Sequence, residues 1–258
     1  MNSLNRIGSR AALTALLAIA FAGCSQTSSE NVTTQGIFAD IRVIAVGNGA
    51  TVVKAQLLVG NGGITQTQLI LAPGDTLSVT ANGIQKPMVR DTSLIGEVEY
   101  WASFPFADAG TLYTVAFSRA NGMSAPNSNV TLPDGFVVML PVTSTVFGTG
   151  EIIDVAWAPS GTAIVPSISI TVECVLIDGI LISESRNLSP STDSGASSIA
   201  VDSVIPSGPI AINENKLCEA TVYLSRQRYG NLDPNYGEGG TISAEHHNRG
   251  TFFVDPKP

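Results

Sequence analysis

The sequence AGTLYTVAFSRANGMSAPNSNVTLP, residues 109 to 133, contains the pattern that decides the fold. Tyr113, Val115 and Phe117 alternate with smaller or polar residues, and this period of two is typical of a half-buried β-strand. Asn121-Gly122 follows, a dipeptide that strongly favours a tight turn between antiparallel strands. The stretch therefore predicts a β-hairpin with one buried face.

This hairpin resembles the last two strands of a fibronectin type III or related immunoglobulin-like domain. In that family a tyrosine near the start of the penultimate strand packs at a corner of the sandwich. Tyr113 occupies the matching position, and Asn121-Gly122 matches the turn into the last strand. The resemblance implies a fold class, the antiparallel β-sandwich.

The rest of the chain continues this rhythm of short strands and turns. No apolar period of 3.6 is sustained after residue 23, so almost no helix is expected. Pro73-Gly74 predicts a type II turn and Asn82-Gly83 a hairpin. The main strands are expected at 39–46, 51–59, 67–71, 76–81, 97–104, 111–119, 136–141, 151–159, 166–179 (ending in an Asp178-Gly179 turn) and 180–185.

Length and composition favour two domains. A chain of 258 residues has room for two domains of about 100 to 120 residues each. Only 13% of the residues are charged, and 25 glycines and 14 prolines supply many turns. Leu132-Pro133-Asp134-Gly135 marks a joint. We therefore expect an all-β fold with two tandem antiparallel β-sandwiches of immunoglobulin-like type, at residues 37–133 and 134–258.

The first 23 residues have the pattern of a signal peptide. Arg6 and Arg10 precede an apolar core at residues 11–21, which is too short to span a bilayer permanently because a spanning helix needs about 20 apolar residues. The formal charge is −8 from 13 basic and 21 acidic residues, and without Arg6 and Arg10 it becomes −10. A chain with this balance has no electrostatic reason to bind nucleic acid.

The end of this segment, Phe21-Ala22-Gly23-Cys24, resembles the lipobox of bacterial envelope lipoproteins, with Phe21 where the family prefers leucine. The resemblance implies that the chain is cleaved before Cys24 and that Cys24 is acylated with a diacylglyceryl group and a further fatty acid such as palmitate. Because Ser25 follows the cysteine, the resemblance also implies attachment to the outer membrane. The protein would face the periplasm or the cell surface. The polar residues 24–36 predict a flexible tether. The alternative is an ordinary signal peptide with a cysteine near its cleavage site.

The other two cysteines are predicted to form a disulfide. Cys174 continues the apolar phase of Ile168, Ile170 and Val172, and Cys218 begins the phase that continues to Leu224, so both thiols are expected on core faces. In an exported domain such a pair should be oxidised to a disulfide. Closing the loop of chain between the two cysteines would add roughly 4 kcal/mol to the free energy of unfolding. Two buried free thiols are the alternative. Trp157 is expected to point inward, but it precedes both cysteines, unlike the antibody pattern.

Residues 225–250 form the most unusual segment. Arginine and tyrosine concentrate there in an otherwise acidic chain, and these side chains dominate interface hot spots. The segment therefore predicts a recognition loop at an end of the sandwich, with Arg226, Arg228, Tyr229, Asp233, Tyr236 and Arg249 as its residues. A weak Ca²⁺ site could use Asp233, Asn235 and Glu238. The alternative is a long final hairpin whose arginines pair with local acids.

No catalytic motif is present. His246 and His247 are adjacent, so on a strand they face opposite sides and cannot easily share one metal. We expect no cofactor beyond the covalent lipid, and a non-catalytic binding or structural module with a protein or polysaccharide partner in the envelope. The alternatives are an enzyme or accessory domain acting on an envelope polymer, and a calcium-dependent carbohydrate binder.

Overall fold

The computed structural model describes residues 25–47, 49–60, 67–93, 96–208 and 211–257. Within these residues the regular structure is β-strand, apart from three single turns of 3₁₀ helix, η1 (Ser29–Asn31), η2 (Thr34–Gly36) and η3 (Val201–Ser203). The strands are β1 (Gln26–Ser28), β2 (Ile37–Val46), β3 (Ala50–Val59), β4 (Thr67–Ile70), β5 (Thr76–Ala81), β6 (Ile84–Pro87), β7 (Val89–Thr92), β8 (Val98–Phe104), β9 (Leu112–Ser118), β10 (Ala125–Thr131), β11 (Val137–Leu140), β12 (Val146–Gly148), β13 (Ile152–Ala158), β14 (Ser167–Val175), β15 (Leu181–Leu188), β16 (Ala196–Ala200), β17 (Cys218–Tyr229) and β18 (Thr241–Asp255).

The first lobe is a β-sandwich around one hydrophobic core. A four-stranded sheet in the order β10-β9-β5-β6 packs against β2, β3, β8 and the first half of β18. Tyr113, Val115 and Phe117 are buried in this core, as the alternation predicts. The turns also form as predicted, with Gly74 at a φ of 90° and Asn82 and Gly83 both at positive φ. The strand alternation and the turn residues of this lobe are local patterns, and the sequence therefore predicted them correctly.

The second lobe is a smaller sandwich with a separate core. A three-stranded sheet in the order β11-β13-β16 packs against β14, β17 and the second half of β18. Trp157 points inward and is 2% exposed. Cys174 and Cys218 are bonded, with their Cα atoms 4.4 Å apart. The predicted disulfide is confirmed, and it joins neighbouring strands of one sheet rather than the two layers of the sandwich.

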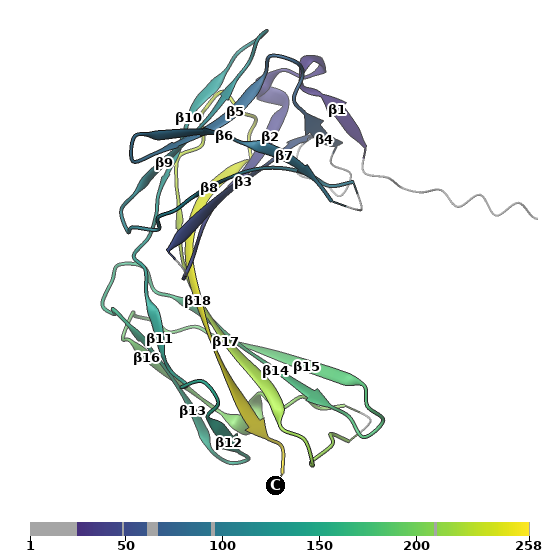
Figure 1. Cartoon of the computed structure of the whole chain (residues 1–258), viewed down its shortest axis with the longest axis vertical. Helices are drawn as coiled ribbons and strands as arrows, with labels where there is room; N and C mark the ends of the chain where they lie inside the picture. Colours follow the sequence, from purple (N-terminus) through teal and green to yellow (C-terminus); the bar gives the residue numbers. More distant parts are fainter. Residues whose placement is uncertain (1–24, 48, 61–66, 94–95, 209–210, 258) are drawn as a thin grey trace, which may run out of the picture.

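One large sheet connects the two lobes. Its eleven described strands follow the order β1-β4-β3-β2-β18-β17-β14-β15, with β7, β8 and β12 attached at the sides. The β17 and β18 strands pair over twelve residues without a break; β18 contributes to both cores, and β17 contributes to the second. Figure 1 shows that this sheet lines the inner side of an arch, with β5, β9, β10, β11, β13 and β16 on the outer side.

The last residues of the chain do not follow the predicted division at residue 133. The chain leaves the first core at Leu132 and enters the second at Phe136, which are the residues at the predicted joint. Afterwards Tyr236, Ile242 and Ala244 return to the first core, because β18 pairs in parallel with β2 over residues 241–247. Residues 134–258 therefore build the second lobe and also complete the first.

The predicted flexible tether is also corrected for its described part, residues 25–36. The β1 strand pairs in parallel with β4, and Ser29 and Thr34 are 0% and 2% exposed. The sequence suggested a tether because the segment has few bulky apolar residues. It is held by hydrogen bonds instead, whose partners lie far away in the sequence. Cys24 and the predicted signal peptide, residues 1–23, lie outside the described residues.

Candidate recognition surface

The predicted recognition loop is largely structural. Of its six proposed residues, Arg226, Asp233 and Tyr236 are buried, with exposed fractions of 0%, 3% and 6%. Arg228 is half-buried, whereas Tyr229 and Arg249 are exposed. Residues 225–229 and 241–250 lie within β17 and β18, and only the turn between them is irregular. The prediction of a single exposed loop is therefore wrong for three of its residues.

Arg226 crosses the junction between the two lobes. Its Nη2 donates to Asp193 Oδ2 at 2.8 Å and to the Pro159 carbonyl at 2.7 Å. Its Nη1 donates to the carbonyls of Asp134 and Gly135 in the joint, and its guanidinium carbon lies 5.0 Å from the Phe136 ring centroid. A buried cation needs an anion and several carbonyl partners of this kind to offset its desolvation. This arginine therefore fixes the joint instead of meeting a ligand.

Asp193 is the anion of this buried pair. Burial by itself would raise its pKa, but hydrogen bonds from Trp157 Nε1 and from Thr162, together with the Arg226 charge, hold the pKa below its ordinary value. The Trp157 hydrogen bond is 2.7 Å long. The carboxylate is therefore ionised and fully engaged at neutral pH. Sequence reasoning did not identify Asp193, because its partner Arg226 is 33 residues away in the chain.

The weak calcium candidates serve the turn after β17. Asp233 Oδ2 accepts from the Asn127 backbone nitrogen at 2.8 Å, and its Oδ1 accepts from the Asn235 nitrogen at 2.9 Å. Tyr236 stacks on Phe117 in the first core, and burial, aided by the Asp233 charge, raises its pKa. Among the described residues no group of three or more His, Cys, Asp or Glu side chains is arranged to hold a metal ion.

The two histidines face opposite sides of β18, as predicted. His246 is 8% exposed and packs against Phe136 at the junction, with ring centroids 5.8 Å apart. His247 lies on the other side, 5.3 Å from the Tyr223 ring. Burial, followed by the charges of His247 and Arg226, lowers the pKa of His246. His246 is therefore a neutral packing residue at neutral pH.

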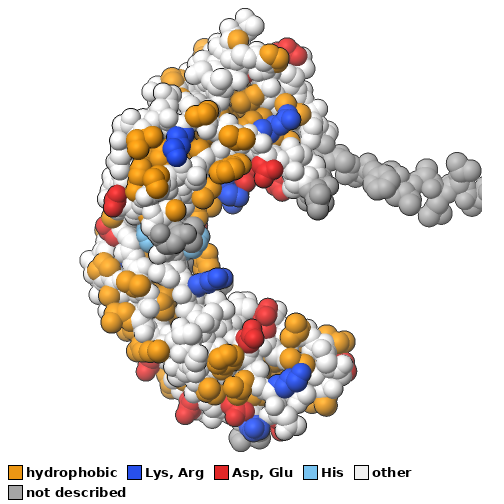
Figure 2. Space-filling view, in the orientation of Figure 1, with side chains coloured by type: hydrophobic (Ala, Val, Ile, Leu, Met, Phe, Trp, Pro, Cys, Tyr) orange, Lys and Arg blue, Asp and Glu red, His pale blue; other side chains and the backbone are white. Residues whose placement is uncertain are grey.

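The exposed candidate is the face of the large sheet opposite the two cores, which we call the open face. Strand alternation places on it Arg42, Lys54, Glu99, Trp101, Tyr223, Tyr229, His247 and Arg249, since each stands on the phase opposite to the buried core residues of its strand. Figure 1 places this face on the inner side of the arch, and Figure 2 shows basic and acidic side chains along that inner curve.

Three aromatic rings on the open face are exposed. Trp101, Tyr223 and Tyr229 have exposed fractions of 39%, 37% and 69%. Trp101 and Tyr229 belong to one cross-strand row through Lys54, Arg42 and Ser243, and four strand spacings separate them by about 19 Å. Tyr223 lies six residues along β17 from Tyr229, or about 20 Å. An extended ligand could therefore contact all three.

The open face of the second lobe is rich in uncharged hydrogen-bonding groups. One row contains Tyr223, Ser169 and Asn187, and the next contains Thr221, Thr171 and Ser185. A groove of about 560 Å³ lies beside Tyr223, lined also by Ser167, Ser169, Asn187 and Pro190. In the first lobe the charges neutralise one another, since Glu99 accepts from Lys54 at 2.7 Å and lies 3.8 Å from Arg42.

Sequence reasoning missed Trp101 and Tyr223 and found Tyr229 and Arg249. The strand phase of Trp101 and Tyr223 could have identified them. Trp101 lies out of phase with Val98, Tyr100 and Ala102, and its neighbours mark the buried side of β8. Tyr223 is out of phase with Val222 and Leu224 in the same way. A large aromatic residue on the polar phase of a strand is a candidate binding residue.

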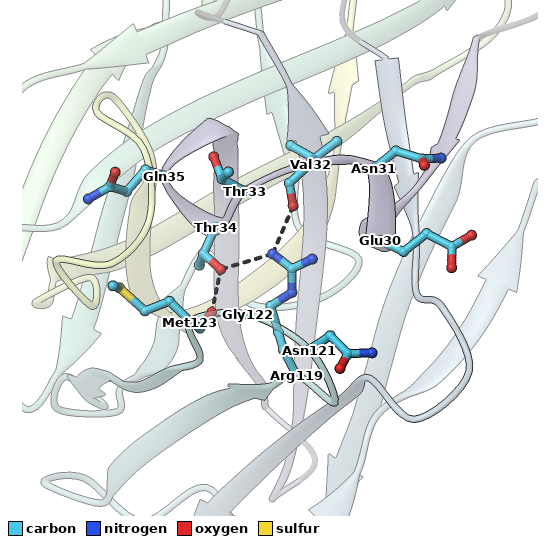
Figure 3. Close-up of a pocket in the computed structure, with 10 residues that line it drawn as sticks. All are labelled: Glu30, Asn31, Val32, Thr33, Thr34, Gln35, Arg119, Asn121, Gly122 and Met123. Atoms are coloured by element: carbon cyan, nitrogen blue, oxygen red, sulfur yellow. Dashed lines mark hydrogen bonds between the residues drawn. The ribbon is translucent and has the colours of Figure 1, made fainter.

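A second hollow, of about 500 Å³, lies between the N-terminal segment and the β9–β10 turn. Its lining consists of Glu30, Asn31, Val32, Thr33, Thr34, Gln35, Arg119, Asn121, Gly122 and Met123. Figure 3 shows Arg119 reaching across it to Val32 and Thr34. The polar groups of this arginine are committed to the chain itself, so the hollow is a weaker ligand site than the open face.

The described residues include no helix of the length and hydropathy needed to cross a membrane. No family model matches the chain, and no curated protein matches it.

Several solved structures are distantly similar. The FN1–FN3 domains of chicken CNTN1 are 9% identical with a TM-score of 0.31, and the match covers 90% of this chain and 68% of that one. Fibronectin(III)-like modules of CbhA from Clostridium thermocellum are 12% identical with a TM-score of 0.27, covering 85% and 94%. SGBP-B of a Bacteroides ovatus mixed-linkage glucan utilization locus, in complex with a heptasaccharide, is 10% identical with a TM-score of 0.20, covering 80% and 52%. The strand arrangement makes the chain an all-β protein with two tandem β-sandwiches, and the solved structures to which it is distantly similar include fibronectin type III modules.

Proposed function

We propose that this protein is a non-catalytic recognition module of the bacterial cell envelope, anchored by a lipid on Cys24, that binds an extended polysaccharide on its open face. The observation that carries the proposal is the set of three exposed aromatic rings, Trp101, Tyr223 and Tyr229, on one polar sheet face that lines the inside of the arch. Aromatic side chains supply large contact area at low entropic cost, and they are over-represented among binding hot spots.

The chemistry around these rings favours a sugar polymer over a protein partner. Protein interfaces center on a desolvated apolar core. Here the groove beside Tyr223 is bordered by hydroxyl and amide groups, which pair well with sugar hydroxyls. Burial, followed by the Glu245 charge, raises the pKa of Tyr223, so its phenol remains a hydrogen-bond donor at neutral pH. The carboxylate of Glu99 is neutralised by Lys54 and Arg42, so it would not repel an acidic sugar strongly.

Replacing Tyr223 or Trp101 by alanine should weaken polysaccharide binding about five- to thirtyfold, because each substitution removes a ring contact of hot-spot type worth about 1–2 kcal/mol. Affinity electrophoresis through gels that contain a soluble galactomannan, xyloglucan or peptidoglycan glycan would measure the effect. Leu112→Ala is the matched control, since Leu112 is 52% exposed on β9, a strand of the outer sheet. Equal retardation of all three variants, or no retardation of the wild type by any glycan, would refute the open-face site.

The anchor has a separate test. Cells that express the wild-type chain should incorporate radiolabelled palmitate into the protein, and Cys24→Ser should abolish the label, because the acyl groups attach to the Cys24 sulfur and to its new amine. Cys174 and Cys218 are bonded to each other and offer no thiol for acylation. Labelling that persists in Cys24→Ser would exclude Cys24 as the anchor without affecting the glycan-binding proposal.

A further inference from the structure

The N-terminal segment, residues 25–36, is a fixed part of the first lobe. The Ser25 carbonyl accepts from the Gln68 nitrogen at 2.8 Å, and the Ser25 Oγ lies 2.7 Å from Thr67 Oγ1. The β1 strand then pairs in parallel with β4, and Gln26 Nε2 donates to the Gly96 carbonyl at 3.1 Å. These contacts tie the residue that follows Cys24 directly to the edge of the large sheet.

A buried ion pair holds the remainder of the segment. Arg119 Nε lies 3.5 Å from Asp75 Oδ2, and both side chains are only 4% exposed. Ser29 Oγ donates to Asp75 Oδ2 at 2.7 Å and accepts from the Ala72 nitrogen at 2.7 Å. Arg119 Nη1 donates to the Val32 carbonyl at 2.8 Å and to Thr34 Oγ1 at 3.1 Å, as Figure 3 shows, and Nη2 donates to the Ser29 carbonyl.

These contacts determine how far a lipid on Cys24 would lie from the folded lobe. Adjacent Cα atoms are about 3.8 Å apart, so a lipid on Cys24 would begin one residue from the folded sheet. A flexible tether of twelve residues would have allowed a mean separation of about 19 Å. The β1 and β4 strands themselves carry no charged side chain, so neither strand presents a carboxylate that anionic headgroups would repel.

We propose that the first lobe rests directly on the bilayer, with the β1–β4 edge against the lipid headgroups and no spacer between them. This inference rests on the proposed acylation of Cys24. Direct seating fixes the tilt of the arch relative to the membrane, because lobe and anchor move as one body. The open face would then be presented at a constant height and orientation.

Energy transfer to the membrane surface tests this seating. The acylated protein would be reconstituted into phosphatidylethanolamine–phosphatidylglycerol vesicles with an acceptor dye on the headgroups, and a fluorescent amino acid would replace Thr92. Thr92 is exposed on β7, the strand whose hairpin Gln26 contacts. A second donor at Leu181, which is 67% exposed in the second lobe, reports the far end.

We expect strong transfer from position 92 and weak transfer from position 181. Inserting twelve Gly and Ser residues between Ser25 and Gln26 should reduce the transfer from position 92 severalfold while the contacts of Ser29 and Arg119 stay intact. Arg119→Ala should give a similar reduction and faster hydrogen exchange at residues 29–36, and Arg90→Ala, on β7, should leave exchange there unchanged. Palmitate-labelled protein whose transfer from position 92 is the same with and without the insertion would overturn direct seating alone. Protein without palmitate label would overturn the anchor and the seating together.

Discussion

Replacing Arg226 by methionine should lower the free energy of unfolding by about 3–5 kcal/mol, because the change leaves Asp193 as an uncompensated charge inside the protein. The two side chains are 0% and 1% exposed, and their closest atoms are 2.8 Å apart. The carbonyls of Asp134, Gly135 and Pro159 lose their donor as well. Urea denaturation at pH 7 would measure the loss.

The pH dependence gives this prediction a specific signature. The folded pKa of Asp193 lies below its ordinary value, so the carboxylate contributes stability above the unfolded pKa of about 3.9, and that contribution is lost as the pH falls through the folded value. In Arg226→Met the carboxylate loses its cation and takes up a proton more readily. The stability difference between wild type and variant should therefore shrink as the pH falls through the higher pKa of Asp193 in the variant and on toward its lower pKa in the wild type.

Two further variants separate this mechanism from a general packing defect. Arg226→Met combined with Asp193→Leu should recover part of the lost stability, since no buried charge remains. Arg186→Met is the surface control, because the Arg186–Glu184 pair is 2.9 Å long but its side chains are 53% and 31% exposed, and exposed pairs contribute about 0–1 kcal/mol. A loss in Arg226→Met no larger than that in Arg186→Met would contradict the buried-pair argument.

The sequence predicted those parts of the fold that depend on local pattern. The alternation of Tyr113, Val115 and Phe117 is visible over a few residues, and so is the Asn82-Gly83 turn. The phase of Cys174 and Cys218 was sufficient to predict their pairing, because two cysteines on buried faces of one domain have few other partners. None of these predictions required knowledge of which distant strands meet.

The predictions that failed concern residues whose partners are far away in the chain. β18 keeps its alternation through Ile242, Ala244 and Phe252, but His246 and Asn248 occupy the same phase where the strand passes between the two cores, so the segment looked like a polar loop. Arg226 looked like a ligand-binding arginine because Asp193 is 33 residues away. Ser29 and Thr34 looked like tether residues because Arg119 is about 90 residues away.

The open face was only partly predictable, because its residues are brought together by strands far apart in the chain. Sequence composition drew attention to Tyr229 and Arg249 because they lie in a segment rich in arginine and tyrosine. Trp101 and Tyr223 join them only through the pairing of β8 with β3, β3 with β2, β2 with β18 and β18 with β17. The parallel β2–β18 pair brings residues about 200 positions apart into register, and no local pattern encodes that contact.

Removing the disulfide should destabilise the second lobe far more than the first. Cys174 and Cys218 follow the Glu173–Glu219 pair, the last pair in the β14–β17 ladder, so the bond closes the end at which these strands would otherwise separate. The closed loop spans 44 positions and contains β15, β16 and η3, including Val201 and Val204 in the second core. By the loop-closure estimate the crosslink contributes roughly 4 kcal/mol.

Hydrogen exchange would locate this effect. In Cys174→Ala/Cys218→Ala, amides of β15, β16 and the end of β14 should exchange at least tenfold faster, whereas those of β5 and β9 should be unchanged because their core lies in the first lobe. Reduced wild-type protein is the better matched comparison, since it keeps both sulfur atoms and loses only the crosslink, and Cys24→Ser should have no effect. Equal acceleration in both lobes would contradict this prediction, and it would mean that β18, which contributes to both cores, couples them so tightly that neither lobe opens alone.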